Sequence, residues 1–242
     1  MYSDTVKLPN KNSVKMIAHR GCSGLETENT AASFVAAGNR SYYGIETDLY
    51  RTSDGKLICH HDKDTGRICE MNLKIEDTSY DTLRSLTLKD IDGETDRADL
   101  KLCSLKEYIK ICKKYNKHAV LELKTNFQSS DIKEIADVFE EFDYLDNMTF
   151  ISFDLRHMGR VRSVLPNQSC QFLTMKWEDD LPHKLKELNV DIDIMASLLN
   201  KERVKILHEH GILINCWTVD DPEMAGRLIE MGVDQITTNI LE

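Results

Sequence analysis

The chain has 242 residues, of which 41% are hydrophobic and 30% are charged, and its formal net charge is -10. This length fits one α/β barrel, which takes roughly 250 residues, and the composition excludes a disordered chain. No apolar run reaches the roughly 20 residues that a membrane-spanning helix needs, so we expect no integral membrane segment. The negative charge repels a nucleic-acid backbone, so we expect no nucleic-acid partner, and a small anion would need local cations to bind.

The amino-terminal stretch MYSDTVKLPNKNSVKM is polar and mixed in charge. It has no apolar region of the kind found in secretory signals, and we therefore expect a cytoplasmic protein. The cysteines are spread along the chain without a Cys-x-x-Cys pair, and they are Cys22, Cys59, Cys69, Cys103, Cys112, Cys170 and Cys216. This spacing indicates buried thiols, and neither a disulfide framework nor a zinc site.

Short apolar runs rich in Ile, Val, Leu and Phe recur along the chain and predict eight β-strands. The predicted strands are residues 14–18, 44–49, 119–123, 149–153, 170–174, 191–195, 212–216 and 234–237. They alternate with stretches of helical character, which is typical of βα units around a parallel sheet. The alternation predicts an α/β fold, a single TIM-type (β/α)₈ barrel domain spanning residues 1–242.

Helical patterns lie between these strands. The predicted helices are residues 30–40, 105–115, 131–142, 154–165, 201–210 and 222–231. Thr30 and Ser104 are expected N-caps, and Pro222 follows Asp221 at a first helical position. Gly232 stands where a helix is expected to end.

One segment breaks the alternation. Residues 63–102 are polar and charged and contain no strand of the barrel type. Residues 57–60, just before it, follow a Ser53-Asp54-Gly55 turn and are expected to pair with the second strand as a hairpin. We expect the segment to be a small insertion after this hairpin that caps the barrel mouth, with a flexible excursion that has no role as the alternative.

Polar side chains gather at the carboxyl ends of the predicted strands, where α/β barrels build their active sites. They are His19 and Arg20 after the first strand, Glu46 and Asp48 on the second, His60 and His61 at the end of its hairpin partner, and Glu122 and Lys124 at the end of the third. Because these strand ends share one face of a barrel, we expect the side chains to converge on one site.

Three of these residues are acids that suit a metal ion. Glu46 and Asp48 lie two residues apart on a strand, so their side chains point to the same face. Two carboxylates on one inward face repel each other unless a cation joins them, whereas a solvated or salt-bridged pair is the alternative. Glu122 completes a set of oxygen ligands that selects a hard divalent cation, Mg²⁺ or Ca²⁺, over zinc.

The same region carries candidates for proton transfer and for phosphate binding. His19 and one member of the His60 and His61 pair are candidates for an acid and a base. Adjacent strand residues face opposite ways, so only one of that pair can enter the site, and physical reasoning alone does not say which. Arg20 and Lys124 suit a phosphate group, with ion pairing to the three carboxylates as the alternative.

The segments IAHRG, ENTAASFVAA and GIETDLYRTSDGKLICHHD occur in this order within the first 62 residues, followed by LELK at 121–124 and NCWTVDDPE at 215–223. They resemble the glycerophosphodiester phosphodiesterase family, whose signature runs His-Arg-Gly, Glu-Asn-Thr, Ile-Glu-x-Asp, Thr-x-Asp-Gly and His-Asp. The likeness spans nearly the whole chain. It implies an α/β barrel with a small insertion after the His-Asp motif, in agreement with the independent prediction for residues 63–102.

The resemblance also implies roles for individual residues. The metal ligands would be Glu46, Asp48 and Glu122, the catalytic pair His19 and His61, the phosphate ligands Arg20 and Lys124, and the residue lining the alcohol pocket Trp217. In this pattern His61 is preferred over His60 because it directly precedes Asp62.

The expected reaction is metal-dependent hydrolysis of glycerophosphodiesters, which are small molecules, to glycerol 3-phosphate and an alcohol. We expect His19 to be the acid and His61 the base, with the reverse assignment open, and Glu28 to orient Arg20. The nucleophile is either water or the neighbouring glycerol hydroxyl. The alternatives are a non-catalytic barrel that binds a phosphorylated ligand and a phosphodiesterase for lysophospholipids, which would need an apolar entry groove.

Two positions depart from the family pattern. Thr27 stands where the family usually has proline, which should only loosen a loop. Asn239 and Ile240 replace a common Thr-Asp-x-Pro ending after the last strand, at the expected barrel mouth. The sequence favours no particular alcohol and predicts no oligomeric state.

Overall fold

The computed structural model describes residues 2–242, and its strands close into a barrel. The barrel strands are β1 (Lys15–Ala18), β2 (Gly44–Arg51), β4 (His118–Leu123), β5 (Met148–Ser152), β6 (Ser169–Thr174), β7 (Asp191–Met195), β8 (Ile214–Trp217) and β9 (Gln235–Thr238). They pair in parallel in the order β1-β9-β8-β7-β6-β5-β4-β2, and β1 also pairs with β2. The short β3 (Leu57–Cys59) pairs antiparallel with β2 and forms the predicted hairpin. The predicted TIM-type barrel is confirmed.

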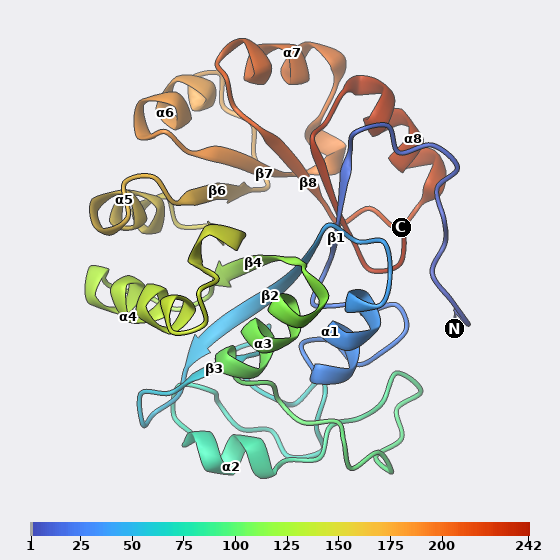
Figure 1. Ribbon diagram of the computed structural model, residues 1–242, viewed down its shortest axis with the longest axis vertical. Coiled ribbons are helices and arrows are strands. Elements are labelled where there is room, and N and C mark those ends of the chain that lie inside the picture. Colours follow the sequence, from blue (N-terminus) through green and yellow to red (C-terminus); the bar gives the residue numbers. More distant parts are fainter. Residues whose placement is uncertain (1) are drawn as a thin grey trace.

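Helices surround the strands (Figure 1). They are α1 (Ala31–Gly38), α2 (Tyr80–Ser85), α3 (Leu105–Tyr115), α4 (Ser129–Glu140), α5 (Leu155–Val164), α6 (Leu181–Leu188), α7 (Lys201–Glu209) and α8 (Pro222–Met231), with short 3₁₀ helices at Leu145–Asn147 and Ala196–Leu198. The sequence prediction omits α6, although Leu181, Leu185 and Leu188 recur at helical spacing. Among residues 2–242, no helix has the length and apolar character needed to cross a bilayer.

The helix ends follow from local side-chain chemistry. The Thr30 side chain accepts a hydrogen bond from the backbone of Ser33 at the start of α1, and Ser104 does the same with Glu107 at the start of α3. Such caps satisfy amide groups that have no partner inside the helix. At the end of α8, Gly232 adopts a φ of 92°, which glycine tolerates best. These contacts confirm the predicted caps.

The main core lies between the outward faces of the strands and the helices, because successive strand residues point to opposite faces. Ile45 and Leu49 of β2 pack there with Tyr108 of α3. Inside the barrel is a smaller apolar cluster made of Ile17, Val120, Ile151 and Leu173, with Trp217 against it. Nearer the amino ends of the strands the interior is polar, with hydrogen bonds linking Gln171, Asn215, Gln235 and Thr237.

The segment at 63–102 lies between β3 and α3 and packs below the barrel, beside α1 and α3 in Figure 1. It has its own apolar cluster, which packs on the β2–β3 hairpin and includes Tyr50, Ile58, Ile68, Ile75, Leu83, Leu88 and Leu100. This packing disfavours a flexible excursion without a role. None of its residues, all of which the structure describes, lines the cavity that opens at the carboxyl ends of the barrel strands, so the segment borders the barrel mouth without covering it.

Candidate active site

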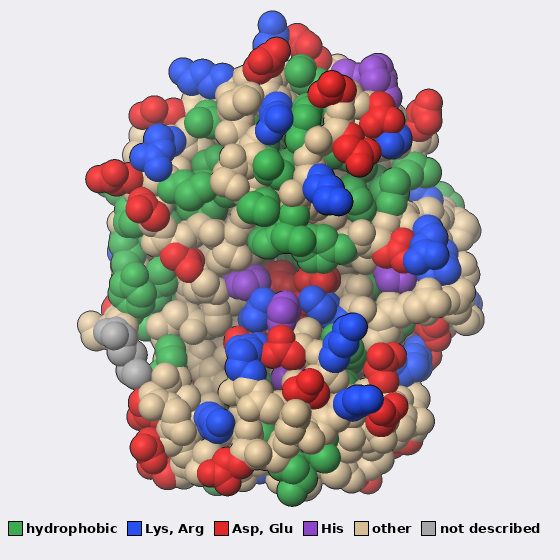
Figure 2. Space-filling model, turned by 180° about the vertical axis from the view of Figure 1, so that it is seen from behind, with side chains coloured by type: hydrophobic (Ala, Val, Ile, Leu, Met, Phe, Trp, Pro, Cys, Tyr) green, Lys and Arg blue, Asp and Glu red, His purple; other side chains and the backbone are tan. Residues whose placement is uncertain are grey.

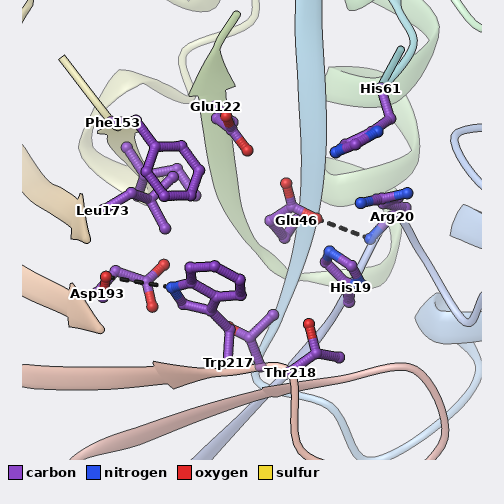
Figure 3. Close-up of a pocket in the computed structure, with 12 residues that line it drawn as sticks. His19, Arg20, Glu46, His61, Glu122, Phe153, Leu173, Asp193, Trp217 and Thr218 are labelled. Carbon is purple, nitrogen blue, oxygen red and sulfur yellow. Dashed lines mark hydrogen bonds between the residues drawn. The ribbon is translucent and has the colours of Figure 1, made fainter. Parts of the chain in front are cut away.

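A cavity of about 220 Å³ opens at the carboxyl ends of the barrel strands. One side is polar and is lined by His19, Arg20, Glu46, His61 and Glu122. The other side is mostly apolar and is lined by Ile151, Phe153, Leu173, Trp217 and one acid, Asp193. Figure 2 shows histidine, basic and acidic side chains in a hollow near the centre of this face, and Figure 3 shows the two sides opposite each other. The residues predicted from strand ends therefore meet at one place.

The three predicted acids converge at the polar side of the cavity, which Glu46 and Glu122 line. Glu46 and Asp48 point inward from β2, and Asp48 lies in register with Glu122 of β4. One carboxylate oxygen of each residue lies within 4.8 Å of the others. All three side chains are buried, with Glu122 the most exposed at 8%.

Burial and mutual repulsion disturb the charges of these acids. Burial, followed by the neighbouring carboxylates, raises the pKa of Glu46 well above its ordinary value and raises the pKa of Glu122 to about 8. Burial also raises the pKa of Asp48, but Lys124 and Arg20 lower it more strongly, to about 2. Lys124 Nζ donates to Glu122 Oε1 at 2.9 Å and lies 3.4 Å from Asp48 Oδ1. The three carboxylates form a set of oxygen donors that fits a hard divalent cation. Lys124 and Arg20 offset the repulsion between the carboxylates only in part, and a bound cation would remove the rest.

Arg20 is oriented by the turn that follows β1. Its φ is 54° and that of Gly21 is 80°. A Cβ at Gly21 would lie 2.4 Å from Ser33 Oγ, so only glycine fits. The backbone N–H of Arg20 donates to Glu46 at 2.8 Å, and its guanidinium Nη1 donates to Glu28 at 2.9 Å. The expected contact with Glu28 is therefore present, and it holds the guanidinium beside the cavity.

The two adjacent histidines point in different directions. His61 lines the cavity, whereas His60 is fully buried outside it. His60 Nε2 lies 2.9 Å from the backbone oxygen of Asp64, and its ring is 6.5 Å from that of Tyr50. The structure thus places His61 in the site, in the position that the family resemblance implies.

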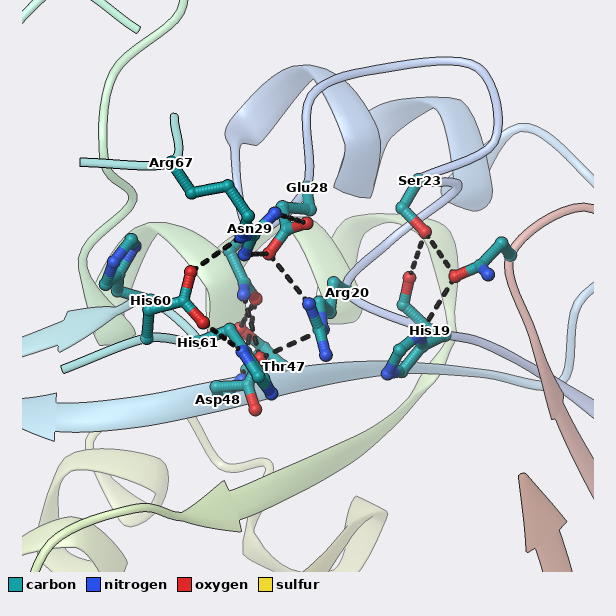
Figure 4. Close-up of polar contacts among 12 residues, drawn as sticks. His19, Arg20, Ser23, Glu28, Asn29, Thr47, Asp48, His60, His61 and Arg67 are labelled. Atoms are coloured by element: carbon teal, nitrogen blue, oxygen red, sulfur yellow. Dashed lines mark hydrogen bonds and ion pairs between the residues drawn. The ribbon is translucent and has the colours of Figure 1, made fainter. Parts of the chain in front are cut away.

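A chain of hydrogen bonds and ion pairs links His61 to Arg20 (Figure 4). His61 Nδ1 lies 2.8 Å from Asp62 Oδ1, and Arg67 Nε donates to the other oxygen of Asp62 at 2.6 Å. Arg67 also donates to both oxygens of Glu28, each at 2.7 Å. Glu28 in turn accepts from Arg20. Segment 63–102 therefore supports the site through Arg67 without entering the cavity.

The other histidine, His19, has an amide as its partner. His19 Nδ1 lies 2.8 Å from Asn239 Oδ1, and Asn239 Nδ2 donates to Asp220 at 2.6 Å. Because a carboxylate accepts hydrogen bonds, Asp220 fixes the amide with its oxygen toward His19. His19 Nδ1 must then be the donor, which leaves Nε2 as an acceptor. Burial, followed by repulsion from Arg20, lowers the pKa of His19 to about 4.

Comparison with known proteins identifies the family. Residues 19–242 match the Glycerophosphoryl diester phosphodiesterase family. The chain belongs to this family. A glycerophosphodiester phosphodiesterase from Bacillus altitudinis is 27% identical over 232 residues, which cover 93% of this chain and 94% of the relative. The predicted family and enzyme class are confirmed.

Solved structures agree with the fold of this glycerophosphodiester phosphodiesterase. A phosphodiesterase from Oleispira antarctica, in complex with the product sn-glycerol-3-phosphate, is 23% identical and has a TM-score of 0.87 over 93% of this chain and 92% of its own. A glycerophosphodiester phosphodiesterase from Parabacteroides distasonis is 30% identical, with a TM-score of 0.77 over 95% of this chain and 94% of its own.

The two departures from the glycerophosphodiester phosphodiesterase pattern both have contacts. The Thr27 hydroxyl donates to the backbone oxygen of Lys89 at 2.8 Å, so it ties the first loop to segment 63–102. Asn239 is the partner of His19, as described above. The expected loosening at Thr27 is therefore offset by a hydrogen bond that proline could not make.

The site of this family member also contains residues that the sequence prediction misses. Asn29 donates to Asp48 at 2.9 Å and accepts from Thr47 at 2.7 Å, which fixes one of the predicted metal ligands. Its place in the Glu-Asn-Thr motif is a signal that could have found it. Asp193 lies in a predicted strand, where an acid among the apolar residues DIDIM is a weaker signal. The role of Asn239 has no local signal, because its partner lies 220 residues away.

Proposed function

We propose that this chain hydrolyses glycerophosphodiesters to glycerol 3-phosphate and an alcohol with a divalent cation, Mg²⁺ or Ca²⁺. Family membership supports the class of reaction. The observation that carries the proposal is the cluster of Glu46, Asp48 and Glu122 at the cavity that His19 and His61 also line. A barrel that only binds a phosphorylated ligand would need neither two histidines facing the same cavity nor the buried acids.

The three acids would hold the cation. Two of them have raised pKa values, and Asn29 already holds Asp48 in place, so the ligands are arranged before a cation binds. A bound divalent cation would stabilise the negative charge that develops on the phosphate oxygens.

The partners of the two histidines support opposite roles in proton transfer. His19 is kept neutral by burial and presents Nε2 as an acceptor, so we assign it as the base that activates the nucleophile. His61 Nδ1 lies 2.8 Å from Asp62 Oδ1, a contact that fixes the orientation of the ring beside the cavity, so we assign it as the acid that protonates the leaving alkoxide. This assignment is the reverse of the one preferred from the sequence.

Substrate contacts are assigned to three residues. Arg20 would bind the phosphate with its oriented guanidinium, and Lys124 would contribute a second positive charge from behind the acids. Trp217 would provide an apolar surface for the organic part, since its ring lines the cavity and its Nε1 donates to the backbone oxygen of Asp193 at 3.2 Å. A cytoplasmic location remains a prediction from the sequence.

An adjacent apolar groove favours lysophospholipids as a second substrate class. The groove, of about 310 Å³, shares Phe153 and Leu173 with the central cavity and continues past Phe172 and Met175. Phe153 is 43% exposed and Met175 is 56% exposed, and because both line the same groove they form a continuous apolar surface beside the cavity. An acyl chain attached to the glycerol would cover both residues.

The test is a substrate panel with and without a chelator. We expect hydrolysis of glycerophosphocholine and glycerophosphoethanolamine to stop in the chelator and to return with Mg²⁺ or Ca²⁺, because the acids would lose their cation. Glu46→Gln should lower activity by about 10³-fold or more, since it removes the negative charge of a proposed metal ligand. Phosphorus NMR of the products would reveal a cyclic phosphate if the glycerol hydroxyl attacks.

The matched control is Glu223→Gln, which removes the charge of a side chain that is 89% exposed and should leave activity unchanged. Full activity of the parent protein in chelator would exclude the metal. Tight binding of an intact diester without turnover would favour the non-catalytic alternative. Faster turnover of a lysophospholipid than of the water-soluble diesters would favour the second class.

A further inference from the structure

Asp193 is a buried acid in the cavity that the proposed chemistry does not use. It lies in the middle of β7, is 1% exposed and lines the apolar side of the cavity. Its Oδ1 atom is buried and has no hydrogen-bond partner in the part of the chain that the structure describes. Figure 3 shows the side chain beside Trp217, facing the space between the two sides of the cavity.

An acid in this position destabilises the folded protein by itself. A buried polar atom without a partner costs about 1–3 kcal/mol, and native proteins contain few of them. Burial, followed by repulsion from Glu122, raises the pKa of Asp193 well above its ordinary value, and no basic group offsets this effect. Burial therefore favours the protonated form of this carboxyl group, and a protonated carboxyl group can both donate and accept a hydrogen bond. Such a group suits a hydroxyl better than a cation.

Two hollows meet at the predicted position of the phosphate. His19 and Arg20 line both the central cavity and a second, larger pocket of about 570 Å³. The second pocket is more open to solvent and includes the acids Glu28 and Asp220. A phosphodiester carries two organic groups, so each hollow can take one. Glycerol is the group that all these substrates share, and the smaller, more enclosed central cavity suits a group of fixed size, whereas the second pocket has room for alcohols of different size.

We propose that Asp193 determines specificity by hydrogen-bonding a hydroxyl of the substrate's glycerol group, whose carbon atoms pack against Trp217 and Leu173. Glycerol has an apolar edge and two hydroxyls, and this side of the cavity offers an apolar surface with one polar side chain. The inference rests on the proposed function. It moves Trp217 from the leaving alcohol, where the resemblance placed it, to the glycerol group.

The experiment compares substrates with and without the glycerol hydroxyls. Asp193→Leu should lower kcat/KM for glycerophosphoethanolamine by about 10- to 100-fold, the effect of a lost buried hydrogen bond. The same change should alter kcat/KM for propylphosphoethanolamine, which lacks both hydroxyls, by less than about threefold. Asp193→Asn keeps a donor and an acceptor and should stay within about tenfold of the parent on both substrates.

Two further measurements can contradict the proposal. Asp193→Leu should unfold in urea at the same or a higher concentration than the parent, because an unpartnered polar group is lost. The loss should be equal for glycerophosphoethanolamine, glycerophosphocholine and glycerophosphoglycerol. A loss confined to glycerophosphoethanolamine and glycerophosphocholine, the two substrates with an ammonium group, would show that Asp193 binds that group and would overturn the proposal. An equal loss on propylphosphoethanolamine, or no loss at all, would overturn it as well.

Binding separates this inference from the proposed function. If the parent protein hydrolyses no diester, the proposed function fails, and calorimetry with glycerol 3-phosphate and with propyl phosphate then decides the inference. We expect the parent to bind glycerol 3-phosphate about tenfold or more tightly than propyl phosphate, and Asp193→Leu to bind the two equally. Equal binding by the parent would exclude a hydroxyl contact.

Discussion

The two sides of the cavity differ in how their polar groups are held. On the side formed by β1, β2 and β4, each functional side chain has a partner, such as Glu28 for Arg20, Asp62 for His61 and Asn239 for His19, although Arg20 Nε makes no hydrogen bond within the described part of the chain and lies 3.5 Å from Asp48. On the side formed by β5 to β8, Asp193 faces the cavity with Oδ1 unpaired among residues 2–242. The paired side is arranged before a substrate arrives, as proton transfer and charge stabilisation require. The other side is left for the substrate to complete.

The largest loss of activity is expected for the two histidines on the paired side of the cavity, and it tests whether that side carries out proton transfer. His19→Ala and His61→Ala should each lower kcat by at least about 10²-fold, because each removes a proton-transfer group. His60→Ala should stay within about tenfold, because His60 lies outside the cavity. Steady-state kinetics, with circular dichroism to check the fold, measures all three. Similar losses of kcat in His60→Ala and His61→Ala would show that lining the cavity does not distinguish the function of the two histidines.

A smaller effect tests how the partner of His19 sets its role. Asn239→Asp places a carboxylate beside His19 Nδ1, which should raise the pKa of His19 from about 4 toward its ordinary 6.5. If His19 is the base, kcat/KM should then fall between pH 6 and pH 5 in the variant but not in the parent, with activity at pH 8 within about threefold. If activity near pH 7 rises instead, His19 is the acid.

The smallest effect concerns a histidine at the opposite end of β4 from Glu122. Burial, followed by Lys15, lowers the pKa of His118 to about 4, and its Nε2 lies 2.8 Å from Thr149 Oγ1. The unfolded chain takes up a proton near pH 6.5 and the folded chain does not, so stability present above pH 6.5 is lost as the pH falls toward 4.

Between pH 7 and pH 5 this loss should be about 1–2 kcal/mol in the free energy of unfolding, measured by urea denaturation. His118→Gln keeps a hydrogen-bonding group beside Thr149 and should flatten this part of the pH dependence while leaving kcat unchanged. A change in kcat would mean that His118, at one end of β4, affects the active site at the other end. An unchanged slope would show that His118 does not contribute to this loss of stability.

Much of the fold followed from local patterns in the sequence. The eight barrel strands and six of the helices were predictable because apolar periodicity and caps such as Thr30 and Ser104 act over a few residues. Glu46 and Asp48 could be placed on one face for the same reason, since a strand alternates with period two. Barrel closure then requires the ends of distant strands to meet, so Glu122 could be added to the set.

Tertiary structure decided what depends on contacts between distant residues. The direction of His61 follows from how β3 joins segment 63–102, where His60 reaches the backbone of Asp64. The partner of His19 comes from the far end of the chain, and the exposure of Asp193 to the cavity depends on the side chains of neighbouring strands. The sequence by itself determined which chemical groups were available and on which strand faces they lie, because those properties are local. Packing determined which groups found partners and which did not, because partners are set by distances in space.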